Sequence, residues 1–285
     1  MDRTQIGVVK DLFRYPVKSM LGERLDELDI SATGVVGDRA YALREANGRV
    51  MTAKKWARLF EFSARYDSPP TAEELAPLSI SLPDGRRVQV QAADASAVLS
   101  DALGRQVVLE RAQSEQRNKA EIDPTTVFGD LTVEQAAPEL GATTLPDFFP
   151  LPPGTFFDSA SIHVLASGSL AHVERLIGDD AQLDARRFRP NILVETDPGQ
   201  DGFVEDGWLE GSLEVGGQVR IVQLQPALRC VMTTHQQTDL KRDMRILRTV
   251  AQQHRNKLGV FAAIETPGTV RVGDPVFLVT QEPGA

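Results

Sequence analysis

The stretch Pro226-Ala-Leu-Arg-Cys230-Val-Met-Thr-Thr234 contains the only cysteine of this 285-residue chain. A single sulfur cannot form an internal disulfide, nor can it build a cysteine-rich zinc or iron–sulfur site by itself. It can act as one thiolate, either as a nucleophile or as a single soft metal ligand, and Arg229 directly before it favours the thiolate form. Taken alone, a free cysteine is more often a small buried hydrophobe. The rest of the sequence decides between these interpretations.

The composition, with 41% hydrophobic and 25% charged residues, is ordinary for a soluble globular protein. A net charge of −9, from 40 acidic and 31 basic residues, argues against a broad nucleic-acid-binding face, which needs a basic excess. The charged N-terminus does not resemble a signal peptide, and no run of about 18 uncharged apolar residues is present. We therefore expect a cytoplasmic protein with no nucleic-acid partner and no membrane segment.

Short segments of alternating polarity dominate the first hundred residues and predict strands at 6–13, 25–30, 39–45 and 62–66. Tight turns are expected at Ala46-Asn47-Gly48 and at Pro83-Asp84-Gly85, the latter between strands 78–82 and 86–90. Helices are predicted at 52–60, with Thr52 as N-cap, and at 94–103, ended by Gly104. Many strands with few helices favour a barrel.

A proline-rich stretch, 113–155, shows little periodicity and is predicted to be a long connection with short elements at most. The sequence after it again predicts many short strands and few helices. Helices are predicted at 170–177 and 240–254 from their apolar faces. Strands are predicted at 161–166, 191–195, 212–215, 218–224, 261–265 and 276–280, with a hairpin turn at Gly216-Gly217.

Five short motifs occur in order along the chain: Tyr15-Pro16-Val17-Lys18-Ser19, Gly37-Asp38-Arg39, Phe188-Arg189-Pro190-Asn191-Ile192, Pro226-x-x-Arg229-Cys230, and the stretch from Pro267-Gly268-Thr269 to Val272-Gly273-Asp274-Pro275-Val276. Each is weak alone. Together and in this order they resemble the MOSC family, the proteins related to the C-terminal domain of molybdenum cofactor sulfurase. The resemblance is strongest for the branch that contains the mitochondrial amidoxime-reducing component and its bacterial relatives, and it covers nearly the whole chain.

The resemblance implies a mixed, β-rich α/β fold with two barrel domains. A MOSC N-terminal β-barrel-like domain is expected at 1–120, a connecting segment at 121–155, and a MOSC β-barrel domain with flanking helices at 156–285. In that family the cysteine sulfur ligates the molybdenum of a pyranopterin cofactor, and Cys230 matches this position. A thiolate suits such a centre, because the dithiolene of the pterin supplies two further sulfurs.

The resemblance also implies a set of cofactor-binding residues. Lys18 and Ser19 match the family's cofactor-contacting pair, and Arg39 matches its basic residue after Gly-Asp. Lysine and arginine suit a phosphate, but Lys18 could equally be a solvated surface lysine and Arg39 could form a strand-end ion pair with Asp38 or Glu45.

Further contacts are expected from the second half of the chain. Arg189 and Asn191 match the family's pterin- and phosphate-binding motif, since a guanidinium can donate two parallel hydrogen bonds and an amide can both donate and accept. Arg229, beside the cysteine, completes this set. Ser167 and Ser169 open the predicted helix and are interpreted first as N-caps and second as cofactor ligands. The neighbouring Arg186 and Arg187 are predicted to lie on a solvated face.

Several other chemistries lack support in the sequence. The four histidines form no zinc-protease pattern, no serine lies in a G-x-S-x-G elbow, and no dinucleotide or P-loop motif is present. One cysteine cannot hold an iron–sulfur cluster in this chain. Pyridoxal phosphate, which the sulfurases bind in a separate upstream domain, is not expected, because the upstream half is too short and too β-rich for that fold.

We therefore expect a molybdenum-cofactor (Mo-molybdopterin) oxidoreductase that reduces N-hydroxylated or N-oxygenated small molecules. Electrons would come from an external donor, a flavin reductase or a ferredoxin. The alternative is a non-catalytic carrier of the cofactor, or of sulfur as a persulfide on Cys230. A third possibility is a MOSC-like barrel that has lost its cofactor.

Overall fold

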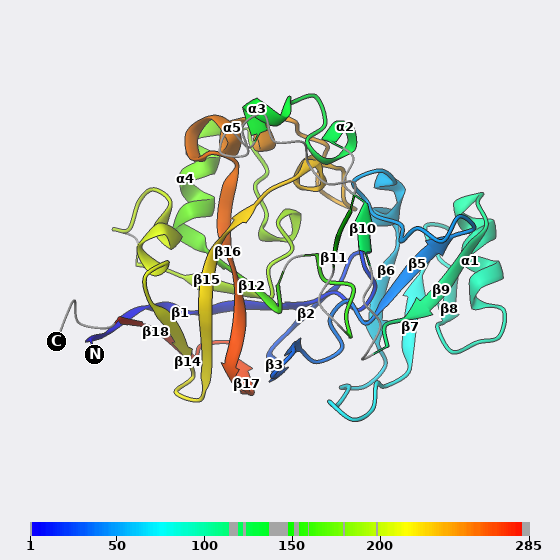
Figure 1. Cartoon of the computed structure of the whole chain (residues 1–285), viewed down its shortest axis with the longest axis horizontal. Coiled ribbons are helices and arrows are strands. Elements are labelled where there is room, and N and C mark those ends of the chain that lie inside the picture. Colours follow the sequence, from blue (N-terminus) through cyan, green and yellow to red (C-terminus); the bar gives the residue numbers. More distant parts are fainter. Residues whose placement is uncertain are drawn as a thin grey trace.

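The structure, a computed structural model, describes residues 2–113, 119–121, 124–136, 148–150, 154–158, 160–178, 180–197 and 199–280. Seven strands close into a barrel in the order β13, β12, β16, β15, β14, β18 and β1, with β1 returning to β13 (Figure 1). Their bounds are β1 (Asp2–Arg14), β12 (Ile162–Ala166), β13 (Ile192–Glu195), β14 (Ser212–Val215), β15 (Val219–Leu228), β16 (Lys257–Thr266) and β18 (Pro275–Thr280). The expected β-rich α/β fold with a barrel is confirmed.

The barrel is mixed, because β12 and β13 run parallel while the neighbouring pairs around it are antiparallel. The parallel pair is connected by α4 (Ser167–Ile177), as a parallel connection requires a crossover. This helix packs beside α5 (Arg245–His254) at one end of the barrel (Figure 1), and the two share a buried apolar cluster that includes Val173 and Val250.

Strand β1 links the barrel to the rest of the chain. Its first part pairs with β18, its middle with β13, and its end with β2 (Glu23–Leu25). The register shifts near Gly7, where a Cβ atom would approach the carbonyl oxygen of Glu195 to 2.2 Å. Only glycine therefore allows β1 to approach β13 this closely. Residues 2–14, which come first in the sequence, are thus part of the barrel formed mainly by the second half.

The first half forms small sheets. The β5–β9 pair and the sheet of β6, β7 and β8 pack on a separate apolar core. Another sheet joins β3 and β4 to β17 from the other half and packs on the barrel core through Leu28 and Ile30. The bounds are β3 (Glu27–Ser31), β4 (Gly34–Val35), β5 (Tyr41–Glu45), β6 (Ser63–Tyr66), β7 (Leu78–Ser81), β8 (Arg87–Gln89), β9 (Val107–Arg111) and β17 (Gly268–Arg271). Two helical segments complete it, η1 (Ala57–Glu61) and α1 (Ala95–Leu103).

Other short elements connect these parts, namely β10 (Lys119–Glu121), α2 (Pro124–Val127), α3 (Val133–Ala136), β11 (Phe148–Pro150), η3 (Ala185–Arg187), η4 (Val204–Trp208) and η5 (Val231–Thr234). The described part of the predicted connection 121–155 contains only such short elements, and the rest of it lies outside the described residues. The domain boundaries at 120 and 156 stay predictions.

Two predicted helices differ from the structure. Residues 52–55 form a turn, and only the short 3-10 helix η1 follows, because Leu59 and Phe60 reach the core within a single turn. The helix predicted at 240–254 begins only at Arg245, because Leu240 pairs with Gln237 in a tight backbone turn. By contrast, α1, with Gly104 left-handed at its end, and the β7–β8 and β14–β15 hairpins are confirmed.

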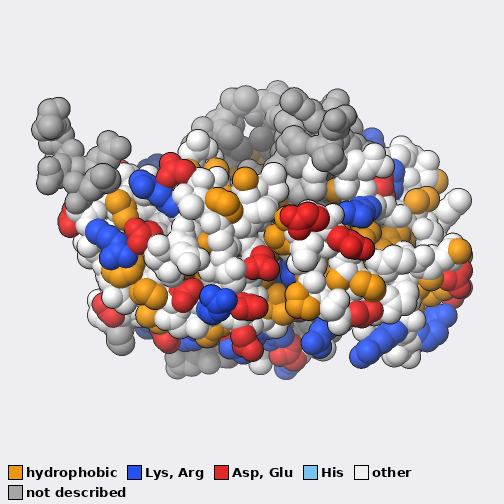
Figure 2. All heavy atoms as spheres, turned by 90° about the horizontal axis from the view of Figure 1, so that it is seen from below, with side chains coloured by type: hydrophobic (Ala, Val, Ile, Leu, Met, Phe, Trp, Pro, Cys, Tyr) orange, Lys and Arg blue, Asp and Glu red, His pale blue; other side chains and the backbone are white. Residues whose placement is uncertain are grey.

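The surface mixes charges of both signs, as Figure 2 shows for one face, where acidic and basic side chains are interspersed. In the described part of the chain, no helix is long and apolar enough to cross a membrane.

The side chain of Asn191 fastens β1 to β12 and β13. Its amide nitrogen donates to the carbonyl of Phe13, and its oxygen accepts from the backbone N–H of His163, all three being buried. We predict that Asn191→Leu lowers the free energy of unfolding by about 1–3 kcal/mol, because these buried backbone groups lose their partner. Urea denaturation followed by circular dichroism measures the change. Asn47→Ala, in an exposed turn, is the control and should stay within about 0.5 kcal/mol of the parent; equal losses in both variants would contradict the assignment.

Candidate functional site

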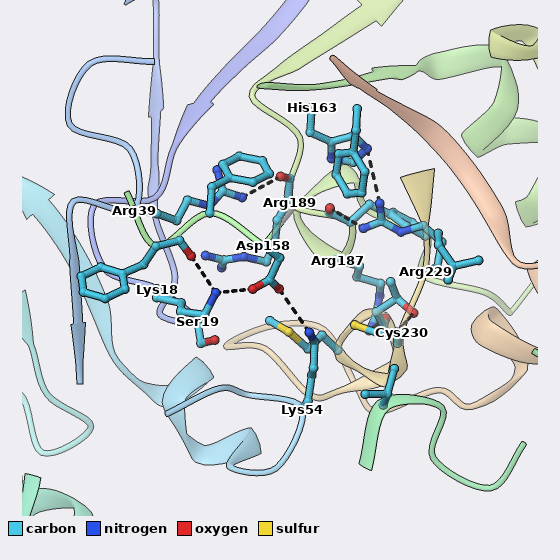
Figure 3. A pocket seen from close by; sticks show the side chains of 18 of the residues that line it. Lys18, Ser19, Arg39, Lys54, Asp158, His163, Arg187, Arg189, Arg229 and Cys230 are labelled. Atoms are coloured by element: carbon cyan, nitrogen blue, oxygen red, sulfur yellow. Dashed lines mark hydrogen bonds and ion pairs between the residues drawn. The ribbon is translucent and has the colours of Figure 1, made fainter. Parts of the chain in front are cut away.

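A cavity of about 230 Å³ lies where the two halves of the chain meet (Figure 3). It is lined by six residues predicted from the sequence: Lys18, Ser19, Arg39, Arg189, Arg229 and Cys230. They come from the loop after β1, the turn before β5, the loop before β13 and the end of β15. The fold thus gathers residues that are more than two hundred positions apart in the sequence, as Lys18 and Cys230 are.

The thiol of Cys230 lies on the wall of this cavity and is half-buried. The residue follows the end of β15 and precedes η5, whose Thr233 donates through both its N–H and its hydroxyl to the carbonyl oxygen of Cys230. Arg229 is fixed beside it by reciprocal bonds with Asn256, because each residue bonds the backbone of the other. The position of the sulfur is therefore set by backbone hydrogen bonds on both sides.

Asp158 joins two lysines at the cavity, as Figure 3 shows. Its carboxylate pairs with Lys18 and, at 3.3 Å, with the Nζ atom of Lys54. Burial alone would raise the pKa of Asp158, but the two ammonium groups outweigh it and hold this pKa well below its usual range. Burial lowers the pKa of Lys18, whereas for Lys54 it is outweighed by Asp158 and Cys230, which raise the pKa.

The ring of Tyr15 contacts two arginines of the cavity. The guanidinium carbons of Arg39 and Arg189 lie 4.5 and 4.1 Å from the centre of its ring. Arg39 also pairs with Asp38 and donates to the carbonyl of Arg189 at 3.1 Å. Burial lowers the pKa of Arg189 to about 10, so this side chain still carries its charge at neutral pH. The aromatic face and the carboxylate partly offset the cost of keeping two cations so close together.

Arg229 is held from two further sides. One guanidinium nitrogen donates to the carbonyl of Phe188 at 2.7 Å, and another lies 3.4 Å from the Nε2 atom of His163. Burial, with the charge of Arg229, lowers the pKa of His163 well below its usual value, so the ring is neutral and can accept this contact.

Three of the lining residues have left-handed backbones, with φ angles of 67° at Ser19, 46° at Arg39 and 57° at Arg189. Such angles are uncommon outside glycine and cost free energy, so they persist only where the surrounding structure imposes them. Their concentration around one cavity is typical of a functional site.

The cavity also leaves donors unused. Among the described residues, Nη2 of Arg189 and Nε of Arg229 are buried and have no hydrogen-bond partner. Asp158 is the only carboxylate among the lining residues, against a larger number of lysines and arginines. A buried cavity with surplus cationic donors is suited to an anionic ligand.

Three predicted site residues lie outside this cavity. The side chain of Asn191 is hydrogen-bonded to the backbone of β1 and β12, as described above. Ser167 lies in the first turn of α4 rather than at its cap, which is Ala166, and its hydroxyl accepts from the N–H of Thr196. The hydroxyl of Ser169 donates to Glu205, whose other carboxyl oxygen accepts from the N–H of Ala166. The start of α4 therefore already holds a carboxyl group of the protein itself, and the prediction that both serines are N-caps is wrong.

The structure also corrects the prediction for Arg187, which was expected on a solvated face. Its side chain is buried and donates to the carbonyls of Gln182, Thr233, His235 and Lys241. These carbonyls come from separate segments, which only the tertiary structure brings together around the guanidinium group. Arg186 does lie at the surface, between Asp184 and Asp239.

Sequence reasoning missed Lys54, Asp158 and His163, which all line the cavity. None lies in one of the five motifs, and the sequence carries no other signal that would connect them to Cys230.

Comparison with known families decides the affiliation of the chain. Residues 152–277 match the MOSC domain, and residues 6–122 match the MOSC N-terminal beta barrel domain. The chain belongs to the MOSC family. Both matched segments contribute side chains to the cavity, Lys18, Arg39 and Lys54 from the first and Asp158, Arg189 and Cys230 from the second.

Alignments with named relatives extend over almost the whole MOSC protein. Mitochondrial amidoxime-reducing component 1 of Mus musculus is 26% identical over 312 residues, which span 97% of this chain and 84% of the mouse protein. The human protein of the same name is 24% identical over the same shares of both chains. Molybdenum cofactor sulfurase of Oryza sativa is 24% identical over 87% of this chain but only 31% of its own length. The MOSC protein is therefore related to molybdenum-cofactor proteins, and at the family level to oxidoreductases.

The residues present fit that cofactor. In the described part of the chain, no three histidines, cysteines or carboxylates cluster as a metal site would require. A metal that brings most of its ligands with it needs only one soft protein ligand, and Cys230 offers one. The guanidinium groups of Arg189 and Arg229, which line the cavity, suit the anionic phosphate and the ring carbonyl of a pterin cofactor.

We predict that Asp158→Asn lowers the free energy of unfolding of the cofactor-free protein by roughly 2 kcal/mol at neutral pH, because two buried ammonium groups lose their counter-charge. The pKa of Asp158 is lower in the folded state than in the unfolded state. Its stabilising effect is therefore complete above the unfolded pKa of about 4 and disappears as the pH falls through the folded pKa. The difference between parent and variant should thus shrink in acid. Urea titrations over a pH series measure this, with the exposed Asp84→Asn as control; a difference that grows below pH of about 4 would contradict the ion pairing.

Proposed function

We propose that this MOSC protein is a molybdenum-cofactor-dependent oxidoreductase that reduces N-oxygenated small molecules with electrons from an external donor. The observation that carries the proposal is the placement of the Cys230 thiol on the wall of a cavity where cationic side chains from both halves of the chain meet. The reaction class is suggested by the relatives that bear the name amidoxime-reducing component.

In this proposal Cys230 is the protein ligand of molybdenum. Lys18, Ser19 and Arg39 hold the phosphate, and Arg189 and Arg229, which line the same cavity, donate to the pterin. When bound, the cofactor supplies two-electron oxygen-atom transfer, and the protein positions and tunes it. The left-handed backbones of Ser19, Arg39 and Arg189 are the local conformations that aim these groups into one cavity.

The other residues act on charge and solvent. Lys54, whose pKa is raised by Asp158 and Cys230, keeps its ammonium group at this wall of the cavity. Phe156, Phe157 and Phe261 form an apolar wall that excludes water and can contact the body of a substrate. Reduction of an N–OH group to N–H consumes two electrons and two protons and releases water. In this proposal the electrons come from an external donor, such as a flavin reductase or a ferredoxin.

A second candidate function is that of a carrier, which would hold the cofactor or a persulfide on Cys230 without catalysing a reduction. The likeness to a molybdenum cofactor sulfurase favours it, as does the accessible single sulfur. It needs the same cavity, so only turnover distinguishes it from the reductase.

We predict about one molybdenum per chain after expression in a host that makes the cofactor. Cys230→Ala should lose at least about 100-fold in reductase activity while the protein stays folded, because the metal loses its only protein ligand. Elemental analysis, circular dichroism and the assay are run on the parent, on Cys230→Ala and on the exposed control Ser68→Ala. Parent protein without molybdenum or tungsten would refute the enzyme assignment and leave the barrel that has lost its cofactor.

We predict that the loaded protein reduces benzamidoxime with reduced viologen but not with NADH alone. Nothing in the sequence matches a site that takes hydride from a nicotinamide, whereas a small dye can donate electrons directly at the open cavity. An anaerobic assay compares both reductants. Turnover with NADH alone would reveal an unrecognised cofactor site, and no turnover with viologen despite full metal loading would favour the carrier.

A further inference from the structure

Leu228 marks an opening of the cavity that holds the Cys230 thiol, which we call the Cys230 cavity. Among the described residues that line this cavity, Leu228 is the only exposed one, with an exposed fraction of 38%. A single exposed leucine on a protein surface is normal. Leu228 differs because it also lines a cavity, and a side chain that does both lies where the cavity meets solvent.

The end of β15 fixes Leu228 in this position. Ala227 is fully buried, so the alternation of side chains along a strand turns its neighbour Leu228 to the other side. The register of β15 against β16 shifts between Pro226 and Leu228, and such irregularities often re-aim side chains beside active sites. The next residue, Arg229, is held by its bonds with Asn256. The strand therefore presents Leu228 at the opening, two residues before the sulfur.

Three further apolar side chains line the cavity together with Leu228. Val127 of α2 and Phe261 of β16 are half-buried, so part of each remains accessible. The ring of Phe157 meets that of Phe261 edge to face, with the ring centres 6.2 Å apart. We call these four residues the apolar rim. A flat, uncharged aromatic group can bury hydrophobic area and make ring contacts against such a surface.

The charged side chains of the cavity have other partners. Asp158 is the one carboxylate among the described lining residues, and it binds both Lys18 and Lys54 (Figure 3). In the proposed function the arginines of the cavity hold the cofactor. A charged substituent on a substrate would compete with these contacts, and its desolvation would be poorly repaid. The apolar rim is therefore the surface that remains to recognise the body of a substrate.

We propose that Leu228 is a specificity-determining residue, which selects substrates whose N-oxygenated group is attached to an apolar, ring-sized substituent. This inference rests on the proposed reductase function, in which the N–OH group is turned toward the Cys230 side of the cavity. The substituent then extends toward the opening and contacts Leu228 and Phe261. Burial of one or two methylene-sized contacts on Leu228 corresponds to about a 4- to 15-fold gain in affinity.

The test compares two amidoximes that share the N–OH group and differ only in the substituent: benzamidoxime carries a phenyl ring and acetamidoxime a methyl group. KM and kcat are measured anaerobically with reduced viologen on the loaded full-length chain. The dissociation constant of each compound is measured on the same proteins without reductant, by ligand-observed NMR. Leu228→Ser removes the apolar contact, and Leu228→Met restores it. Val108→Ser is the matched control, because Val108 is an exposed apolar residue outside the cavity lining.

We expect Leu228→Ser to raise KM and the dissociation constant for benzamidoxime about fourfold or more, because the phenyl ring loses its contact at the opening. Both constants for acetamidoxime should rise less than about twofold, since a methyl group does not reach Leu228. Leu228→Met should restore the preference for benzamidoxime, and Val108→Ser should keep it. Thermal unfolding verifies that each variant is folded.

The two measurements distinguish this inference from the proposed function. Binding of benzamidoxime that depends on Leu228 but leads to no turnover would refute the reductase and support the role of Leu228. Turnover that Leu228→Ser leaves unchanged, or lowers equally for both amidoximes, would support the reductase and overturn the inference. A parent protein that neither binds nor reduces benzamidoxime would overturn both.

Discussion

The barrel closes only because β1, the first strand of the sequence, pairs with β13 and β18 from the second half. This closure also places the cavity, since β1 continues through Tyr15 directly into Lys18 and Ser19. The close approach at Gly7 and the amide of Asn191 hold β1 in position. Fixing one strand in the wall of the barrel therefore brings the basic residues of the first half opposite Cys230 without a long or flexible connection.

Concentrating lysines and arginines in a buried cavity is costly, and the protein offsets this cost in three ways. Asp158 and Asp38 supply carboxylates, backbone carbonyls accept from Arg39, Arg189 and Arg229, and the ring of Tyr15 contacts the guanidinium groups of Arg39 and Arg189. The compensation is incomplete, because two guanidinium nitrogens keep no partner among the described residues. Such a surplus is expected of a site that completes its electrostatics with an anionic ligand.

The sequence by itself determined the β-rich fold, most strands, the hairpins and a set of basic residues that line one cavity with Cys230. These features depend on the local alternation of polar and apolar residues, on turn residues and on short motifs. All of these can be recognised from neighbouring residues in the sequence. Only the tertiary structure decided which residues meet: it added Lys54, Asp158 and His163 to the cavity, buried Arg187, and assigned Asn191, Ser167 and Ser169 to contacts outside the cavity. The physical reason is that the burial and the partners of a polar side chain are set by segments far away in the sequence, as the four carbonyls around Arg187 illustrate.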